Sequence, residues 1–258
     1  MPDSLRDSVA RFSDRAQDYA KYRPHYPHNV VQALRETCGL TPQHLIADVG
    51  CGPGMLAEIL LDNGNSVIGV EPNAEMRQAG EKYLAGYPAF RMIEGSAEAT
   101  TLDSASVDFV VAGQAFHWFR LQEARLEFAR ILKPGGWAVM VWNDRDSKST
   151  PFLQAYEALV RHYAIDYEQV SHKWVASYEA LQRFFAPNEM TLIKQHNQQR
   201  LDLDGLRGRL LSSSYIPKSG ERYEAMMRAL PQLFSAHARD DRVVLEYDTN
   251  IYCGHLDR

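Results

Sequence analysis

Cysteine is scarce in this sequence, and long hydrophobic runs are missing. The three cysteines, Cys38, Cys51 and Cys253, stand far apart and form no CxxC pair, which excludes a disulfide framework and indicates a reducing compartment. The first residues lack the apolar core of a signal peptide. No apolar run approaches the ~18 residues that a membrane-spanning helix needs. We therefore expect a cytoplasmic location and no membrane partner.

An excess of positive charge is also absent. The chain has 28 Lys and Arg against 33 Asp and Glu, a formal net charge of -5. Proteins that bind nucleic acid through its phosphates are usually basic, so we expect no nucleic-acid partner. His162, His172, His196 and His237 show no metal-ligand spacing, so we expect no metal. With 45% hydrophobic and 24% charged residues, the 258 residues suffice for a globular core.

Short apolar runs alternate with amphipathic segments through the first half of the chain. Such alternation predicts an α/β fold with a parallel sheet and helices on both faces. The expected strands cover 44–49, 66–70, 90–94, 107–112 and 137–142; the expected helices cover 28–38, 55–63, 73–84 and 121–132, with Pro134-Gly135-Gly136 as a turn. Residues 190–196 are expected to return to the sheet, and 243–251 alternate with the period of a half-buried strand.

The remaining segments are expected to surround this core within one domain, residues 1–258. Apolar residues at helical spacing between Leu5 and Tyr19 predict an amphipathic helix. The aromatic-rich stretch after residue 150 and the patterns at 203–212 and 221–234 predict further helices. The expected parts are a helical lid at 1–40, a ligand-binding core at 41–146, cap elements at 147–188 and 203–236, and final strands at 189–202 and 237–258.

A glycine-rich loop follows the first expected strand. Gly50, Gly52 and Gly54 allow a tight turn and let backbone amides approach a ligand closely. The helix that follows offers free amides and a partial positive charge at its N-terminus. The dinucleotide fingerprint G-x-G-x-x-G needs a glycine at position 55, where this chain has Met55. Structural turns also use glycine, so the loop alone is weak evidence for a ligand.

An acidic residue ends the second expected strand. Glu71 stands twenty-one positions after Gly50, where a carboxylate can accept hydrogen bonds from both hydroxyls of a ribose. A solvated turn acid is the alternative, and the glycine loop at the right distance favours the ribose role. Polar groups also follow the third strand, at Ser96-Ala97-Glu98, and the fourth, at Gln114-Ala115-Phe116-His117-Trp118. These are the carboxyl ends of parallel strands, where ligands bind in such folds.

Together these segments resemble the class I S-adenosylmethionine (SAM)-dependent methyltransferases, particularly their type 11 group. The resemblance covers residues 44 to 142; at the N-terminus, Tyr22, Arg23, Pro24 and Tyr26-Pro27 are similar to the trans-aconitate methyltransferase-like subgroup. It implies a Rossmann-like, mostly parallel seven-stranded sheet, SAM as cofactor, S-adenosyl-L-homocysteine as product, and a small-molecule acceptor. The implied cofactor-binding residues are Tyr22, Arg23, Gly50, Cys51, Gly52, Glu71, Pro72, Met76, Ser96, Ala97, Glu98 and Gln114. Ser96 stands at a position where the family often has Asp, and its hydroxyl can still form a hydrogen bond with the cofactor.

The acceptor site is expected between the sheet edge and the cap, at Trp118, Ser214 and Tyr215. A carboxylate acceptor needs no base, whereas a hydroxyl acceptor favours one, for which His117 is the candidate. A structural role for His117 is the alternative. Arg23 is a candidate for the cofactor's carboxylate or for an anionic substrate. The oligomeric state is left open.

Two other functions remain compatible with parts of this pattern. A nicotinamide-dependent oxidoreductase shares the sheet and the ribose acid, but Met55 and the loop at 96–98 count against it. A non-catalytic SAM-binding module is the second alternative. A wide aromatic-lined cavity would favour an enzyme, and a cap that fills the pocket would favour the module.

Overall fold

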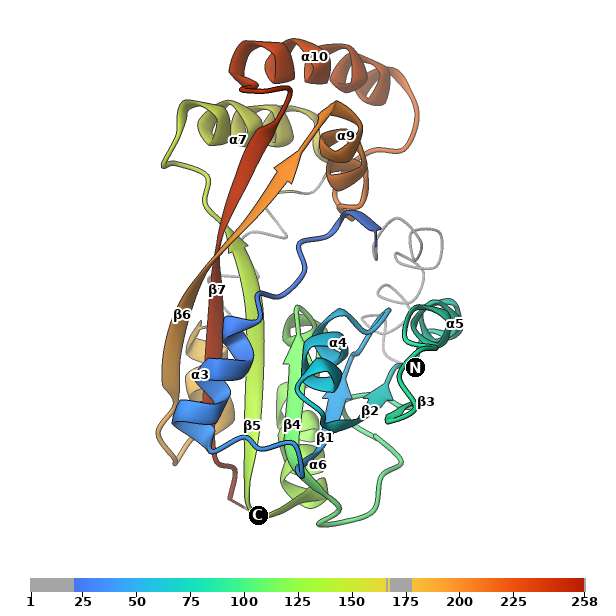
Figure 1. The fold of residues 1–258 in the computed structure, drawn as a ribbon, viewed down its shortest axis with the longest axis vertical. Helices are drawn as coiled ribbons and strands as arrows, with labels where there is room; N and C mark the ends of the chain where they lie inside the picture. The colour runs from blue at the N-terminus through green and yellow to red at the C-terminus, as the bar shows by residue number, and fades with distance from the viewer. Residues whose placement is uncertain (1–20, 166, 168–177, 258) are drawn as a thin grey trace.

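A seven-stranded sheet forms the centre of the molecule in the computed structural model, which describes residues 21–165, 167 and 178–257 (Figure 1). The strand order is β3-β2-β1-β4-β5-β7-β6. The strands are β1 (Leu45–Val49), β2 (Ser66–Val70), β3 (Phe90–Ile93), β4 (Val107–Gly113), β5 (Leu132–Arg145), β6 (Thr191–Leu201) and β7 (Val243–Gly254). All neighbouring pairs from β3 to β5 are parallel, whereas β7 runs antiparallel to both β5 and β6. The expected Rossmann-like, mostly parallel sheet is confirmed.

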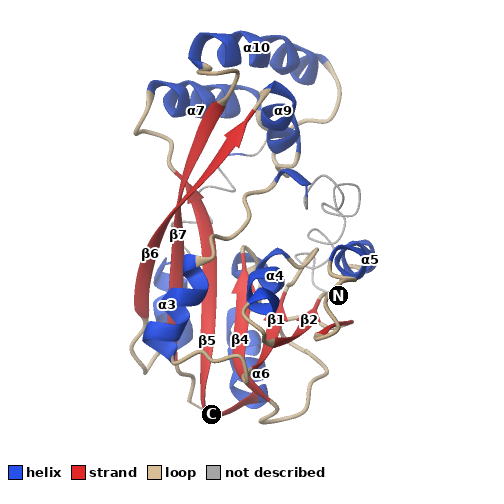
Figure 2. Ribbon diagram, in the orientation of Figure 1, coloured by secondary structure: helices blue, strands red, loops and turns tan. Residues whose placement is uncertain are grey.

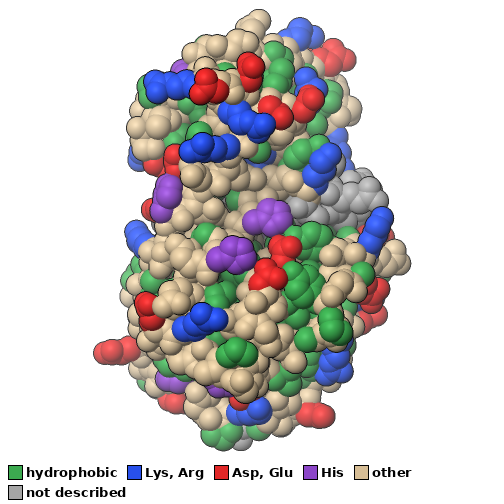
Figure 3. Space-filling view, viewed as in Figure 1, with side chains coloured by type: hydrophobic (Ala, Val, Ile, Leu, Met, Phe, Trp, Pro, Cys, Tyr) green, Lys and Arg blue, Asp and Glu red, His purple; other side chains and the backbone are tan. Residues whose placement is uncertain are grey.

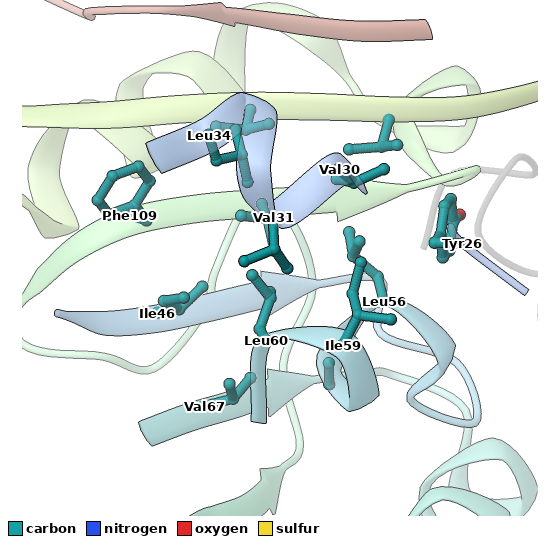
Figure 4. Close-up of a cluster of buried hydrophobic side chains, with 14 of the residues drawn as sticks. Tyr26, Val30, Val31, Leu34, Ile46, Leu56, Ile59, Leu60, Val67 and Phe109 are labelled. Atoms are coloured by element: carbon teal, nitrogen blue, oxygen red, sulfur yellow. The ribbon is translucent and has the colours of Figure 1, made fainter. Parts of the chain in front are cut away.

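Helices cover both faces of the sheet, as Figure 2 shows. They are α3 (Asn29–Cys38), α4 (Met55–Asp62), α5 (Ala74–Tyr83), α6 (Leu121–Ile131), α7 (Pro151–Tyr163), α9 (Leu203–Leu211) and α10 (Glu221–His237), with the 3-10 turn η2 (Phe116–Trp118) and a further helical stretch at 178–185. On one face, α3 and α4 bury Val31, Leu34 and Leu60 against the sheet (Figure 4). On the other, Phe128 of α6 and Phe184 pack together.

Helix α3 does not belong to a lid, although a lid was expected to cover residues 1–40. Its apolar side chains belong to the same core as Ile46 of β1, with Val30 and Leu34 almost completely buried. Gly39 then ends the helix in the left-handed conformation, at φ 64°, which glycine adopts without steric strain. Residues 29–38 therefore form a helix that packs on one face of the sheet. The amphipathic helix expected between Leu5 and Tyr19 lies outside the described residues.

Strands β5, β6 and β7 are longer than expected and extend beyond the parallel strands, with α7, α9 and α10 packed at their far end (Figure 1). There Tyr156 of α7, Leu210 of α9 and Leu230 of α10 share a core with Leu245 and Tyr247 of β7. Thr150 caps the N-terminus of α7, because its side chain accepts a hydrogen bond from the Leu153 amide. This helical region has a hydrophobic core of its own, separate from those on the two faces of the sheet.

Two expected boundaries were wrong for identifiable reasons. The expected turn Pro134-Gly135-Gly136 lies inside β5, because Leu132 already pairs with Val107 and pairing resumes at Trp137. The glycines form an excursion within the strand, with Gly135 at φ 77°. Helix α10 includes Pro231, as expected, but runs three residues beyond the expected end at 234, to His237. A proline removes one helical hydrogen bond, but the buried Leu230 and Phe234 on either side keep the helix packed.

Within the described residues, no helix is both long enough and apolar enough to cross a membrane.

The core on the α3–α4 face is expected to dominate stability. Leu60 is fully buried there, whereas Leu126 of α6 is 65% exposed. Leu60→Ala should lower the free energy of unfolding by roughly 2–5 kcal/mol, because it removes buried methyl groups and leaves a cavity. Leu126→Ala is the control and should change it little. Urea denaturation measures both variants, and equal effects of the two substitutions would contradict the placement of Leu60 in the core.

Candidate ligand-binding site

A deep pocket opens at the carboxyl ends of β1, β2 and β4. About 1100 Å³ of space lies within it, a volume that includes the solvent at its open mouth. Its wall consists of Arg23, Pro24, Tyr26, Asp48, Gly50, Cys51, Gly52, Pro53, Met55, Leu56, Glu71, Pro72, Asn73, Met76, Ser96, Ala97, Glu98, Gly113, Gln114, Ala115, Trp118 and Phe119. Loops after four parallel strands therefore converge on one cavity, as expected at this edge of the sheet.

The glycine loop forms the floor of the pocket. Gly50 and Gly52 have φ values of 68° and 55°, which favour glycine. A Cβ atom at Gly50 would lie 2.6 Å from the Ala115 Cβ, so no side chain fits there. The Gly50 and Cys51 amides both donate to the Val70 carbonyl. The loop is thus fixed against the end of β2 while its backbone borders the cavity.

Glu71 links this loop to the end of β2. Its Oε2 accepts a hydrogen bond from the Gly52 amide (2.9 Å), and its Oε1 accepts one from the Asn73 amide (3.0 Å). Burial raises the pKa of the carboxyl group, and these two amides and Arg77 oppose that rise. A carboxylate can accept about four hydrogen bonds. Glu71 therefore keeps acceptor capacity for hydroxyl groups of a ligand.

Asp48 contributes a second buried acid to the pocket wall. Its side chain is 1% exposed, and burial raises its pKa to about 7. Within the described residues, its carboxyl oxygens form no hydrogen bond of regular geometry, although the Cys51 thiol and the Ala57 amide are close enough to favour ionisation. A carboxyl group in this position is suited to a cationic ligand, whose charge would replace the missing solvation.

The loops after β3 and β4 are held in tight conformations. Ser96 and Ala99 exchange backbone hydrogen bonds, and Glu98 Oε1 accepts a hydrogen bond from the Arg120 amide. Gln114 has a left-handed backbone, φ 57°, which is uncommon for a residue other than glycine. Its Nε2 donates to the Asn143 carbonyl, while its Oε1 is buried with no hydrogen-bond partner among the described residues. Such strain is typical of ligand-binding loops.

Amide side chains of β5 and β6 fix the N-terminal segment that covers one side of the pocket. Asn143 Nδ2 donates to the Pro24 carbonyl, Asn197 Nδ2 to that of His25, and Gln199 Nε2 to that of Tyr22. These bonds give three carbonyl groups of the segment, of which that of Pro24 is buried, their hydrogen-bond partners. They place residues 23–26 beside the loop after β4.

The structure brings most of the expected site residues together. On the pocket wall lie Arg23, Gly50, Cys51, Gly52, Glu71, Pro72, Met76, Ser96, Ala97, Glu98 and Gln114 of the expected cofactor set, and Trp118 of the expected acceptor set. Their roles remain predictions.

Four expected residues do not line this pocket: Tyr22, His117, Ser214 and Tyr215. Tyr22 is turned toward α9, so that a Cβ atom at Gly208 would lie 2.5 Å from its ring. His117 lies in η2 beside Trp118, with ring centroids 4.9 Å apart. Ser214 and Tyr215 follow α9 in the helical region, where the Tyr215 carbonyl accepts a hydrogen bond from the Ile165 amide.

Several wall residues were missed from the sequence. Asp48 stands directly before the glycine loop, and its position at the end of an apolar strand is a signal that could have identified it. Asn73 caps α5 by accepting a hydrogen bond from the Met76 amide, and a cap signal at a strand–helix junction could have identified that too. Tyr26 belongs to the N-terminal segment that carried the subgroup resemblance, whereas Phe119 had no local signal, because only the fold brings it to the wall.

Comparisons with known proteins agree with this geometry. Residues 47–140 match a protein family described as "Methyltransferase domain". An uncharacterized methyltransferase of Schizosaccharomyces pombe is 33% identical over 150 residues, 58% of each chain. A malonyl-[acyl-carrier protein] O-methyltransferase of Enterobacter lignolyticus is 32% identical over 152 residues, 56% of this chain and 59% of that protein. In both cases the match spans less than two thirds of the relative's length.

Solved structures support the same fold. A candidate type II methyltransferase from Anaeromyxobacter dehalogenans superimposes with a TM-score of 0.64, covering 92% of this chain and 99% of that one at 22% identity. Identity at this level supports the fold alone. The comparisons do not distinguish the trans-aconitate subgroup from other members.

The raised pKa of Asp48 makes a testable contribution to stability. The folded protein retains this proton up to about pH 7, whereas an unperturbed Asp releases it near 3.8. The free energy of unfolding that Asp48 contributes therefore falls as the pH rises between these values, and the fall is complete above about pH 7. Asp48→Asn does not ionise. The variant's free energy of unfolding, minus that of the wild type, should grow from about pH 5 to about pH 8.

Urea denaturation across this pH range measures the difference, with Asp103→Asn as the control for loss of an exposed carboxylate. A pH-independent difference for Asp48→Asn would show that the carboxyl group does not titrate in this window.

Proposed function

We propose that this chain, whose residues 47–140 match a methyltransferase domain, is a class I SAM-dependent methyltransferase that transfers the methyl group of SAM to a small-molecule acceptor. The observation that carries the proposal is the pair of buried acids, Asp48 and Glu71, which line one pocket together with the glycine loop. SAM is a nucleoside whose amino-acid tail, with its sulfonium, carries a net positive charge. A site for SAM therefore needs an acid that binds the ribose and a second negative group near the tail.

The residues present fit such a cofactor. Glu71 would accept hydrogen bonds from the ribose hydroxyls with its remaining acceptor capacity. Asp48 and the backbone of the glycine loop border the space for the amino-acid part, where the negative charge of Asp48 favours a cation. Met76 and the backbone of Ser96 and Ala97 offer an apolar and hydrogen-bonding surface for a purine ring.

When bound, SAM supplies an activated methyl group on a sulfonium. The chain's residues have to bind, orient and shield the reactants, because no further activation of the donor is required. Trp118 and Phe119 follow β4 and line the same cavity, where their rings exclude water from the acceptor side. Phe119 also packs edge-on against Phe116 and Phe128, which holds its ring in place.

An oxygen acceptor that needs no strong base suits this pocket best. The wall residues include no histidine. Of the three acids on the wall, Asp48 and Glu71 are assigned to the donor, and Glu98 already accepts a hydrogen bond from the Arg120 amide. A carboxylate is already nucleophilic, whereas a hydroxyl requires a base. The name of the malonyl-[acyl-carrier protein] relative specifies O-methylation by that protein, which supports an oxygen acceptor here. We therefore favour a carboxylate acceptor and assign no catalytic base, His117 included.

The open, aromatic-lined cavity supports an enzyme over a non-catalytic SAM-binding module, because no described side chain fills it. The proposal retains the cytoplasmic location expected from the sequence.

The cofactor assignment predicts a selective loss of binding when Glu71 is changed. Glu71→Gln should weaken binding of SAM and S-adenosyl-L-homocysteine by roughly tenfold or more, because charge-assisted hydrogen bonds are lost. Glu81→Gln, an exposed position on α5, is the matched control. Isothermal titration calorimetry measures both, with NADH as a competing ligand. Unchanged SAM affinity in Glu71→Gln would contradict the role of Glu71 in SAM binding, and tighter binding of NADH than of SAM would contradict SAM as the cofactor.

The acceptor side is tested separately at Trp118. Trp118→Ala should lower turnover or raise KM for the acceptor while leaving SAM affinity nearly intact, because the ring lines the pocket without belonging to the glycine loop. Transfer of labelled methyl groups to a panel of small carboxylic and hydroxy acids gives the kinetics. Loss of SAM binding with an unchanged acceptor KM would place the acceptor elsewhere.

A further inference from the structure

A second group of polar residues lies buried inside the helical region, outside the pocket wall. Arg209 of α9 is 5% exposed. Its Nε donates to the Tyr247 hydroxyl (3.2 Å) and its Nη1 to the Ser213 hydroxyl (3.0 Å). No Asp or Glu pairs with Arg209 within the part of the chain that the structure describes. A guanidinium buried without a counter-charge is strongly unfavourable unless something else compensates it.

A second buried guanidinium increases the imbalance. Arg145, at the end of β5, is 10% exposed, lies 4.8 Å from the centre of the Tyr156 ring, and pairs with Glu157 of α7. That carboxylate is already shared, because it also accepts hydrogen bonds from Arg161 (2.8 Å) and from the Tyr167 hydroxyl (2.8 Å). Two buried arginines therefore have one shared carboxylate between them. The interior of this region carries an excess of positive charge.

Hydroxyl groups surround the two guanidiniums. Tyr156 is 1% exposed, and its hydroxyl has no hydrogen-bond partner among the described residues. Burial would raise the pKa of Tyr215, but the nearby Arg145, Arg209 and Arg23 outweigh that effect and lower it. Tyr215 is thus surrounded by positive charge. By contrast, the visible surface of these helices mixes both signs of charge (Figure 3), so the uncompensated charge is internal.

The cluster adjoins the methyl-donor pocket through a short chain of contacts. Arg23 lines that pocket, and its Nη2 donates to the Ser212 carbonyl (3.1 Å). The next residue, Ser213, accepts the hydrogen bond from Arg209. In Figure 1 the segment that begins at residue 21 passes directly below α9. An acceptor that reaches from the pocket toward α9 would therefore meet the two arginines.

We propose that Arg145 and Arg209, with the Tyr156 hydroxyl, bind an oxyanionic group of the methyl acceptor, remote from the atom that is methylated. Planar guanidiniums bind carboxylates and phosphates through paired hydrogen bonds, and the tyrosine hydroxyl supplies a further donor. The bound anion would compensate the buried charge of Arg209. This inference rests on the proposed function for the identity of the ligand as the acceptor, but anion binding by the cluster is independent of SAM.

Arg209→Met tests the site through stability as well as binding. The unliganded variant should unfold at the same temperature as the wild type or higher, because methionine removes an uncompensated buried charge while retaining most of the volume. A purely structural arginine predicts a lower unfolding temperature. Arg207→Met, on the same helix but exposed and paired with Asp204, is the matched control. Tyr156→Phe is a second variant that keeps the ring packing and loses only the hydroxyl.

Anion binding is measured by the shift in unfolding temperature at constant ionic strength. The probes are acetate, succinate, citrate and inorganic phosphate, with chloride and the neutral succinamide as references. Wild type and Arg207→Met should be stabilised by carboxylates, by phosphate, or by both, which identifies the preferred oxyanion. Arg209→Met should lose the stabilisation, and in Tyr156→Phe the apparent affinity should fall. Stabilisation no greater than with chloride, or stabilisation retained in Arg209→Met, overturns the proposal.

A final assay separates this inference from the proposed function. SAM binding by calorimetry and methyl transfer to dicarboxylates are compared with transfer to their monoamides. Under the proposal, Arg209→Met raises KM for dicarboxylates by roughly tenfold or more and leaves SAM affinity unchanged. If SAM does not bind, the proposed function fails while the anion result stands. If SAM binds and monoamides are methylated as efficiently as dicarboxylates, the anion site for the acceptor is wrong.

Discussion

Two hydrogen bonds to the Glu71 carboxylate determine the geometry of the pocket floor. The amides of Gly52 and Asn73 belong to the connections after β1 and β2, and one side chain holds both. Because the carboxyl group is buried, losing either bond would leave a poorly solvated charge. The glycine loop, the start of α5 and the end of β2 therefore depend on Glu71 even before a ligand binds. The residue expected to bind the cofactor also organises the site.

A comparable constraint acts on the opposite side of the pocket. Residues 23–25 lie beside β5 and β6 without regular structure, so their carbonyl groups need donors from elsewhere. Asn143 provides one, and its own Oδ1 accepts from Thr249 (2.6 Å) and Asn197 (3.2 Å). Three strands are thus tied to the segment that carries Arg23. This network explains why Asn143 and Thr249 stay buried and polar in an otherwise apolar layer.

The parts of the molecule that could be predicted are those governed by local sequence. Strand β2 was predicted with its observed boundaries, and the acid at its end lies on the pocket wall. Tertiary context decided the rest. The excursion at Gly135 depends on pairing between β4 and β5. Tyr22 can pack against α9 because Gly208 leaves room for its ring. Arg209 showed no signal at all, since an arginine in an amphipathic helix is normally exposed.

Charge is distributed unequally between the two halves of the site, and this arrangement has a consequence for selectivity. The pocket is bordered by the acids Asp48 and Glu71, whereas the neighbouring helical region holds Arg145 and Arg209. Under the proposed function, a cationic donor would be attracted to the first and repelled by the second, and an anionic acceptor would behave in the opposite way. Each reactant would therefore be disfavoured in the other's place. The acids come from the ends of β1 and β2, while the arginines come from the end of β5 and from α9, so a substitution in one group can leave the other intact.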